Sequence, residues 1–167
     1  SFNIDTNGQV VTFGSSIQSS SGSLTKIGSG TLILSGANTY NGVTQINSGG
    51  TLKLGASNAI ADASDMNVLG TFDLNGYSDS VDEIYGSGLI TNSSVSSTST
   101  LTVGANNGTN TYTGTITDAS GVYPLSLVKT GTGTITLSGI DTYRGQTTIN
   151  PGGALRITNA SALGDIS

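Results

Sequence analysis

The sequence predicts an all-β fold, a parallel β-helix or β-solenoid with about three short strands in each of about five coils. Three observations predict it: short segments of alternating apolar and polar residues recur along the 167 residues, a long block occurs twice, and aromatic residues make up only 5% of the chain, with no Trp. A β-sandwich requires no sequence repeat, needs longer strands and usually fills its core with large side chains, so these observations favour the solenoid.

The long block is repeated at an offset of 103 residues. Positions 24–52 and 127–155 align without a gap, and 17 of the 29 positions are identical. A shorter similarity links residues 2–5 with residues 72–75. We therefore expect a single solenoid domain or fragment over residues 1–167, with repeat blocks at 22–61 and 125–164 and related units near 2–21 and 70–120.

The alternating segments are about three to five residues long and are separated by Gly, Asn, Asp and Ser, which favour turns. Side chains alternate between the two faces of a strand, so each segment has one apolar and one polar face. Residues 56–65 are the best helix candidate, but their Ser, Asn and Asp content predicts a loop with at most one helical turn. The apolar positions predict an inward core of Leu32, Leu34, Ile46, Leu52, Leu54, Leu74, Ile84, Leu101, Val103, Ile116, Ile135, Leu137, Ile149, Leu155 and Ile157.

The composition excludes several classes of function. The chain has neither His nor Cys, so metal sites built on imidazole or thiolate, Ser-His catalysis, cysteine nucleophiles and disulfides are excluded. Only five residues are Lys or Arg and the net charge is −5, which argues against a nucleic-acid partner. No apolar run approaches the length of a membrane span, so we expect no membrane insertion of this segment.

Both long blocks carry the same pattern, Lys-x-Gly-x-Gly-Thr, then Asn/Asp-Thr-Tyr-x-Gly, then Gly-Gly-x-Leu. In this pattern, residues 22–52 and 127–155 resemble the passenger-associated repeat of Gram-negative autotransporter proteins, which are type V secreted or surface proteins. The resemblance implies a right-handed parallel β-helix that is exported and displayed at, or shed from, the cell surface. The membrane-embedded translocator of such proteins is absent from these residues, so we expect a fragment or a processed piece.

Acidic residues are concentrated in one region, which suggests two kinds of chemistry. A Ca²⁺ site or a carboxylate pair for glycoside cleavage would use such residues. Asp82 and Glu83 are adjacent, however, so on a strand they would point to opposite faces and could not act as a pair. We therefore interpret the region as solvated and loop-rich, and we expect no catalytic, cofactor-binding or metal-binding residue. The six acidic residues are Asp62, Asp65, Asp73, Asp79, Asp82 and Glu83.

Basic residues recur at equivalent repeat positions, Lys26 with Lys129 and Lys53 with Arg156, while Arg144 stands apart. A row of cations could bind an acidic glycan. We interpret these residues instead as outward strand positions that discourage pairing at sheet edges.

Three tyrosines, Tyr40, Tyr112 and Tyr143, share the Asn/Asp-Thr-Tyr-x-Gly pattern. They could line a carbohydrate platform, but their recurrence at one turn favours rings that pack over a corner of the coil. The Gly-x-Gly segments at 28–30 and 131–133 are interpreted as corners, because no helix follows them to form a phosphate site.

We expect a non-catalytic extracellular β-helix segment of an autotransporter-like passenger, which acts as a surface stalk or adhesin scaffold and requires no cofactor. Its expected partner is a host surface or a glycan, contacted by the segments 56–68 and 106–110. The alternative is a self-assembling filament whose subunits stack head to tail through open solenoid ends, since residues 1–5 and 164–167 do not resemble caps. A polysaccharide-acting β-helix enzyme is the third hypothesis.

Overall fold

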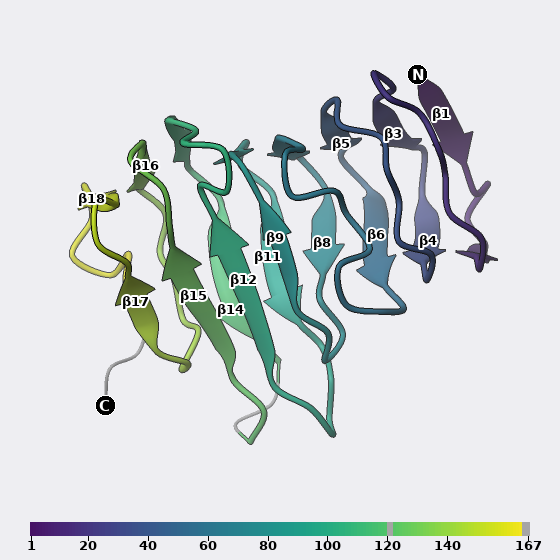
Figure 1. Ribbon diagram of the computed structural model, residues 1–167. Helices are drawn as coiled ribbons and strands as arrows, with labels where there is room; N and C mark the ends of the chain where they lie inside the picture. The colour runs from purple at the N-terminus through teal and green to yellow at the C-terminus, as the bar shows by residue number, and fades with distance from the viewer. Residues whose placement is uncertain (120–121, 165–167) are drawn as a thin grey trace.

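The described strands of the protein pair in parallel with their neighbours. The computed structural model describes residues 1–119 and 122–164, and in this part of the chain every ladder between strands is parallel. The coils follow one another from the purple N-terminal end to the yellow C-terminal end (Figure 1). The prediction of a parallel β-solenoid is confirmed.

The strands form three faces of the solenoid. The first face contains β1 (Phe2–Asp5), β3 (Leu24–Ile27), β5 (Thr44–Ile46), β7 (Met66–Val68) and β10 (Ile84–Tyr85), followed by β13 (Asn110–Tyr112), β16 (Thr134–Leu137) and β18 (Ala154–Ile157). The second face contains β2 (Val10–Phe13), β4 (Gly30–Leu34), β6 (Gly50–Leu54), β8 (Thr71–Asp73), β11 (Leu89–Asn92) and β14 (Thr115–Asp118). The third face contains β9 (Asp79–Val81), β12 (Ser99–Val103), β15 (Leu125–Lys129) and β17 (Thr147–Ile149).

The first face runs the whole length of the described solenoid. A parallel bridge between Gly86 and Tyr112 joins its five-stranded sheet to its three-stranded sheet. Five strands plus three give eight stacked positions in the described residues, which seven turns connect. At about 4.8 Å per turn, the stack is about 34 Å long. The expected number of coils, about five, was therefore too low.

The number of coils exceeds the prediction because some coils carry only two strands. In the first repeat block, residues 35–43 and 55–65 form the third side of their coils as loops. These loops stack on each other, and the Asn38 amide donates to the Ala59 carbonyl at 3.3 Å. As expected, residues 56–65 contain no helix.

The second repeat block contains a corresponding loop at residues 138–146, but this loop lies on the second face. There it stacks on β14, and the Thr142 amide donates to the Ile116 carbonyl at 2.9 Å. Because some coils contain two strands and a loop, the same strands occupy more coils than they would at three strands per coil.

Inward side chains of successive coils stack in register. On the second face, Leu32, Leu52, Phe72, Ile90 and Ile116 follow one another in directly paired positions, and all are fully buried. Such a column removes apolar surface from water along the five coils that it spans. The prediction of a single stacked core is confirmed.

The predicted core residues from Leu32 to Leu137 are all fully buried. Leu155 is only partly buried, whereas Ile149 and Ile157 are 50% and 44% exposed, and their assignment to the core is wrong. The reason is position: β17 and β18 each pair with a described strand on one side only. An inward side chain needs a coil on both sides to be covered.

Within the described residues, no helix is long and apolar enough to cross a membrane.

Candidate functional site

The two repeat lysines lie inside the solenoid. Lys26 and Lys129 are fully buried, so their interpretation as outward positions is wrong. The Lys26 ammonium donates to the carbonyls of Ile27, Gly28 and Ser29 at 2.8, 3.1 and 3.1 Å. Burial lowers the pKa of Lys26, and the Asp5 carboxylate opposes this shift.

Lys129 repeats the arrangement. Its ammonium donates to the carbonyls of Thr130 and Gly131, and burial lowers its pKa against the opposing effect of Asp82. Each lysine is the last inward residue before a Gly-x-Gly corner, where carbonyls turn toward the interior; Gly28 and Gly131 both have φ +65°. The interpretation of the Gly-x-Gly segments as corners is confirmed. Because the two lysine ammonium groups bind corner carbonyls inside the solenoid, they are not available to an acidic glycan.

The three repeated tyrosines are fully buried and offer no platform for a sugar. Thr44 donates a hydrogen bond of 3.1 Å to the Tyr40 hydroxyl, and the Tyr143 hydroxyl lies 2.7 Å from the Thr147 hydroxyl at the equivalent repeat position. Burial raises the pKa of both phenols above the ordinary value. Their structural interpretation is supported.

Tyr112 differs from the other two, because it lies in strand β13 rather than in a loop. Its hydroxyl donates to the Gly88 carbonyl at 2.8 Å, and burial raises its pKa. The shared pentapeptide therefore encodes an inward tyrosine but not a single backbone conformation.

An acidic cluster gathers at the corner between β9 and β10. Carboxylate oxygens of Asp65, Asp82 and Glu83 all lie within 4.8 Å of one another. The expectation that Asp82 and Glu83 point to opposite faces is wrong, because this corner is not a strand. Burial, then Glu83 and Asp82, raise the pKa of Asp65.

Three carboxylates could ligate Ca²⁺, but two of them already cap a corner. Asp82 accepts the amides of Asn106 and Gly108 at 2.8 and 2.7 Å. Glu83 accepts the Thr109 amide at 2.9 Å and the Asn110 side-chain amide at 2.7 Å. These bonds explain the cluster as a support for the exposed turn at 105–109.

Another buried acid secures a loop that we expected to be a contact surface. Asp79 accepts the amides of Ala59 and Ile60 at 2.9 and 3.1 Å, and burial raises its pKa to about 7. Ala59 and Ile60 are themselves buried, and residues 66–68 form β7. Much of the expected contact segment 56–68 is therefore core.

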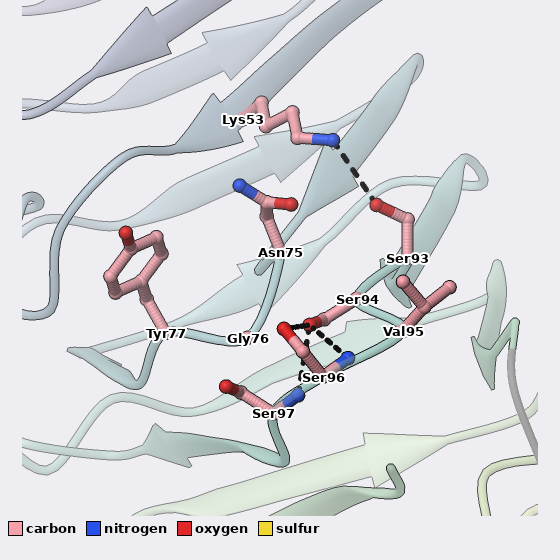
Figure 2. A pocket seen from close by; sticks show the side chains of 9 residues that line it. All are labelled: Lys53, Asn75, Gly76, Tyr77, Ser93, Ser94, Val95, Ser96 and Ser97. Atoms are coloured by element: carbon pink, nitrogen blue, oxygen red, sulfur yellow. Dashed lines mark hydrogen bonds between the residues drawn. The ribbon is translucent and has the colours of Figure 1, made fainter. Parts of the chain in front are cut away.

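The structure contains a groove that the sequence did not reveal. It has a volume of about 380 Å³ and lies where β8 leads to β9 and β11 leads to β12, at the corner between the second and third faces (Figure 2). Tyr77 stands on one side of the hollow, and Ser93 and Val95 stand on the other. The groove is lined by Lys53, Asn75, Gly76, Tyr77, Ser93, Ser94, Val95, Ser96 and Ser97.

Two buried polar side chains hold the walls of this groove. Asp73 accepts the amides of Asn75 and Ser93 at 2.9 and 3.0 Å, accepts the Ser93 hydroxyl at 2.6 Å, and forms an ion pair of 3.0 Å with Lys53. Lys53 also donates to the Ser93 hydroxyl at 3.2 Å. One carboxylate therefore fixes both loops and the lysine beside them.

The second support is Asn92, which is fully buried. Its side-chain oxygen accepts the amides of Gly76 and Ser94 at 2.8 and 3.2 Å. Its nitrogen donates to the carbonyls of Ser97 and Tyr123 at 3.1 and 2.9 Å. A buried amide with four hydrogen bonds restrains the backbone of both loops.

One feature of the sequence could have indicated the groove. The serine-rich run at 93–97 is longer than a corner requires. Tyr77, by contrast, could not be assigned to the groove, because its partner loop follows one coil later.

Comparison with known proteins gives a consistent picture. The family model described as passenger-associated-transport-repeat matches residues 24–58 and 127–157, inside the two predicted blocks. The adhesin BmaC autotransporter of Brucella suis biovar 1 (strain 1330) is 37% identical over 151 residues. The match covers 87% of this chain and 4% of that protein, so the chain spans a small part of its curated relative. No solved structure matches significantly.

Proposed function

Because the chain is an autotransporter passenger β-helix segment that carries passenger-associated transport repeats and is related to an adhesin, we propose that it is a non-catalytic stalk and adhesin scaffold on the outside of the bacterial cell. The relative's name supports adhesion, and the family supports a surface or secreted location. The proposal concerns this segment, because the relative is far longer.

The observation that carries the proposal is the unbroken inward column of five paired apolar residues on the second face. A rod with one continuous core is suited to holding a surface at a distance, since each inner coil is supported by the coils on both sides. The buried charged groups described above bind corner carbonyls and amides, which supports a scaffold more than a reactive site.

Adhesion can be tested with the purified chain coupled to beads. We expect the beads to adhere to cultured epithelial cells more than beads coated with albumin. The matched control is Leu137→Asp, which buries an unpaired charge and should unfold its coils. Equal adhesion of the folded chain and albumin would contradict the adhesive role, and electron micrographs without short rods would contradict the stalk.

Head-to-tail assembly remains a second proposal for the partner. The last described strands on two faces, β17 and β18, expose Ile149 and Ile157, which a further coil would cover, whether from the same polypeptide or from another copy. Electron microscopy distinguishes the two cases: long fibres of purified chain support self-assembly, and isolated rods contradict it.

A further inference from the structure

We propose that the groove between the β8–β9 and β11–β12 connections binds a neutral oligosaccharide. This inference rests on the proposed adhesive function and names the chemical class of the ligand. It uses surface that the core does not require, because Tyr77 and Val95 at the rim are 37% and 79% exposed.

The groove is preorganised. Asp73 bonds to backbone amides of both loops, and Asn92 bonds to both loops as well. A ligand therefore meets walls that are already fixed, and binding costs little conformational entropy in the protein. A volume of about 380 Å³ is near the lower end of the range of roughly 300–1,000 Å³ for ligand clefts, which suits one or two sugar rings.

The lining indicates an uncharged, hydroxylated ligand. Among the described residues that line the groove, Lys53 alone carries a charge, and Asp73 pairs with it at 3.0 Å. The rest of the lining is mainly hydroxyl, amide and backbone groups, which exchange hydrogen bonds with sugar hydroxyls. Lys53 alone offers too little charge for a polyanion, and Tyr77 and Val95 alone offer too little apolar surface for a lipid.

The Tyr77 ring supplies the contact for the apolar face of a sugar. It is the exposed aromatic side chain of the lining, and it stands across the hollow from the serine loop (Figure 2). An aromatic ring gives a large contact area and leaves its hydroxyl free to meet polar groups. Because the groove is shallow and polar, we expect a dissociation constant on the order of 1 mM.

The test is saturation-transfer NMR on the purified chain. The neutral probes are lactose, diacetylchitobiose and maltotriose, and the acidic probes are sialyllactose and a chondroitin sulfate disaccharide. We expect the signals of at least one neutral probe to lose intensity when the protein is irradiated, because a bound probe receives saturation from the protein. Tyr77→Ala should weaken its binding about five- to tenfold, whereas Tyr85→Ala, a control on the first face, should leave it unchanged.

Ser96→Trp provides an independent test that leaves Tyr77 in place. Ser96 is exposed, so a bulky side chain there should fill the hollow without disturbing the core, and should abolish binding. Thermal melting of each variant checks that it is folded. Absence of neutral-probe binding, preference for the acidic probes, or binding that survives both Tyr77→Ala and Ser96→Trp would overturn the inference.

The bead assay separates this inference from the proposed function. Beads that adhere while no neutral sugar binds would leave adhesion in place and refute the groove. Sugar binding without bead adhesion would support the groove and contradict the adhesive function.

Discussion

The two repeat blocks share one sequence pattern but occupy different faces of the solenoid. In the first block, β3 and β5 lie on the first face and β4 and β6 on the second. In the second block, the equivalent strands β15 and β17 lie on the third face, and β16 and β18 on the first. The second block is therefore rotated by one face about the axis of the rod.

The rotation arises because the offset between the blocks is not a whole number of coils. Four full turns lead from β3 to β13 on the first face, and β14 and β15 add two further sides. The intervening coils are also longer: β5 begins 20 residues after β3, whereas β13 begins 26 residues after β10. The repeat encodes a fixed order of elements: a strand, a corner, a second strand and a loop. The length of the chain that precedes the repeat determines on which face this order begins.

Burial also differs between the blocks. Ile46 and Leu54 are fully buried, but their counterparts Ile149 and Ile157 are about half exposed. β5 and β6 have paired strands on both sides, whereas β17 and β18 have a described partner on one side only. Burial in this fold is therefore a property of the stack and not of the repeat.

Equivalent truncations should expose this difference most strongly. Leu54→Ala removes a fully buried side chain and should cost about 3 kcal/mol of unfolding free energy. Ile157→Ala, at the equivalent position, should cost about 1 kcal/mol or less because its site is already open. Urea unfolding of both variants measures the two values, and equal losses would mean that β18 is covered in solution.

The buried lysines should be important for stability in both blocks. Lys26→Met and Lys129→Met remove the ammonium groups that bind corner carbonyls, so each should cost about 1–3 kcal/mol. Lys53→Met, on an outward and partly exposed lysine, is the comparison and should cost about 1 kcal/mol or less. Thermal unfolding tests this; three equal small losses would place all the lysines outside.

At one repeat position the first block has Asn38 and the second block has Asp141. Both side chains accept a hydrogen bond from a backbone amide, but only the second can carry a charge. Asn38 accepts the Ile17 amide at 2.6 Å, and Asp141, its counterpart, accepts the Ile116 amide at 2.7 Å. The Asn38 side chain also donates to the Ala59 carbonyl at 2.6 Å, whereas the second carboxylate oxygen of Asp141 is buried without a hydrogen-bond partner among the described residues. Burial raises the pKa of Asp141 from its usual 3.8 to about 6.

The sign of the resulting pH dependence follows from this raised pKa. The folded state holds the proton more tightly than the unfolded state, so the contribution of Asp141 is fully present below about pH 3.8 and is lost as the pH rises through about 6. Asp141→Asn should remove this loss and stabilise the protein above pH 6 by about 1 kcal/mol. Melting temperatures at pH 5 and pH 8 test it, and a variant that is less stable than the parent at pH 8 would contradict it.

The smallest effect is expected on the outward side of the second block. Thr136 faces away from the core between Thr111 and Arg156. Thr136→Ala should change the unfolding free energy by less than about 1 kcal/mol. A larger loss in urea unfolding would indicate that this face is covered.

The sequence patterns predicted the features that depend on residues close together in the sequence, such as which side chains of a strand point inward. Alternation identified the inward residues from Leu32 to Leu137, because a strand places every second side chain on one face. It misplaced Lys26 and Lys129, since their inward direction is favourable only where corner carbonyls receive the charge.

Features that depend on contacts between coils could not be predicted in this way. The adjacent pair Asp82 and Glu83 required knowledge of a corner, and the groove required two loops that meet only after one more turn of the chain. The number of coils depended on which sides of a coil are loops rather than strands. The repeated tyrosine pattern did not show this, because it occurs in two loops and in strand β13.

Disulfide trapping tests the rotated stack most directly. The chain has no cysteine, so pairs can be introduced one at a time. Thr111 and Thr136 are paired neighbours on β13 and β16, at a separation that suits a disulfide. The structure predicts that Thr111→Cys with Thr136→Cys oxidises readily, whereas Thr117→Cys with Thr136→Cys stays reduced. A disulfide in the second pair and none in the first would place β16 on the second face and contradict the rotation.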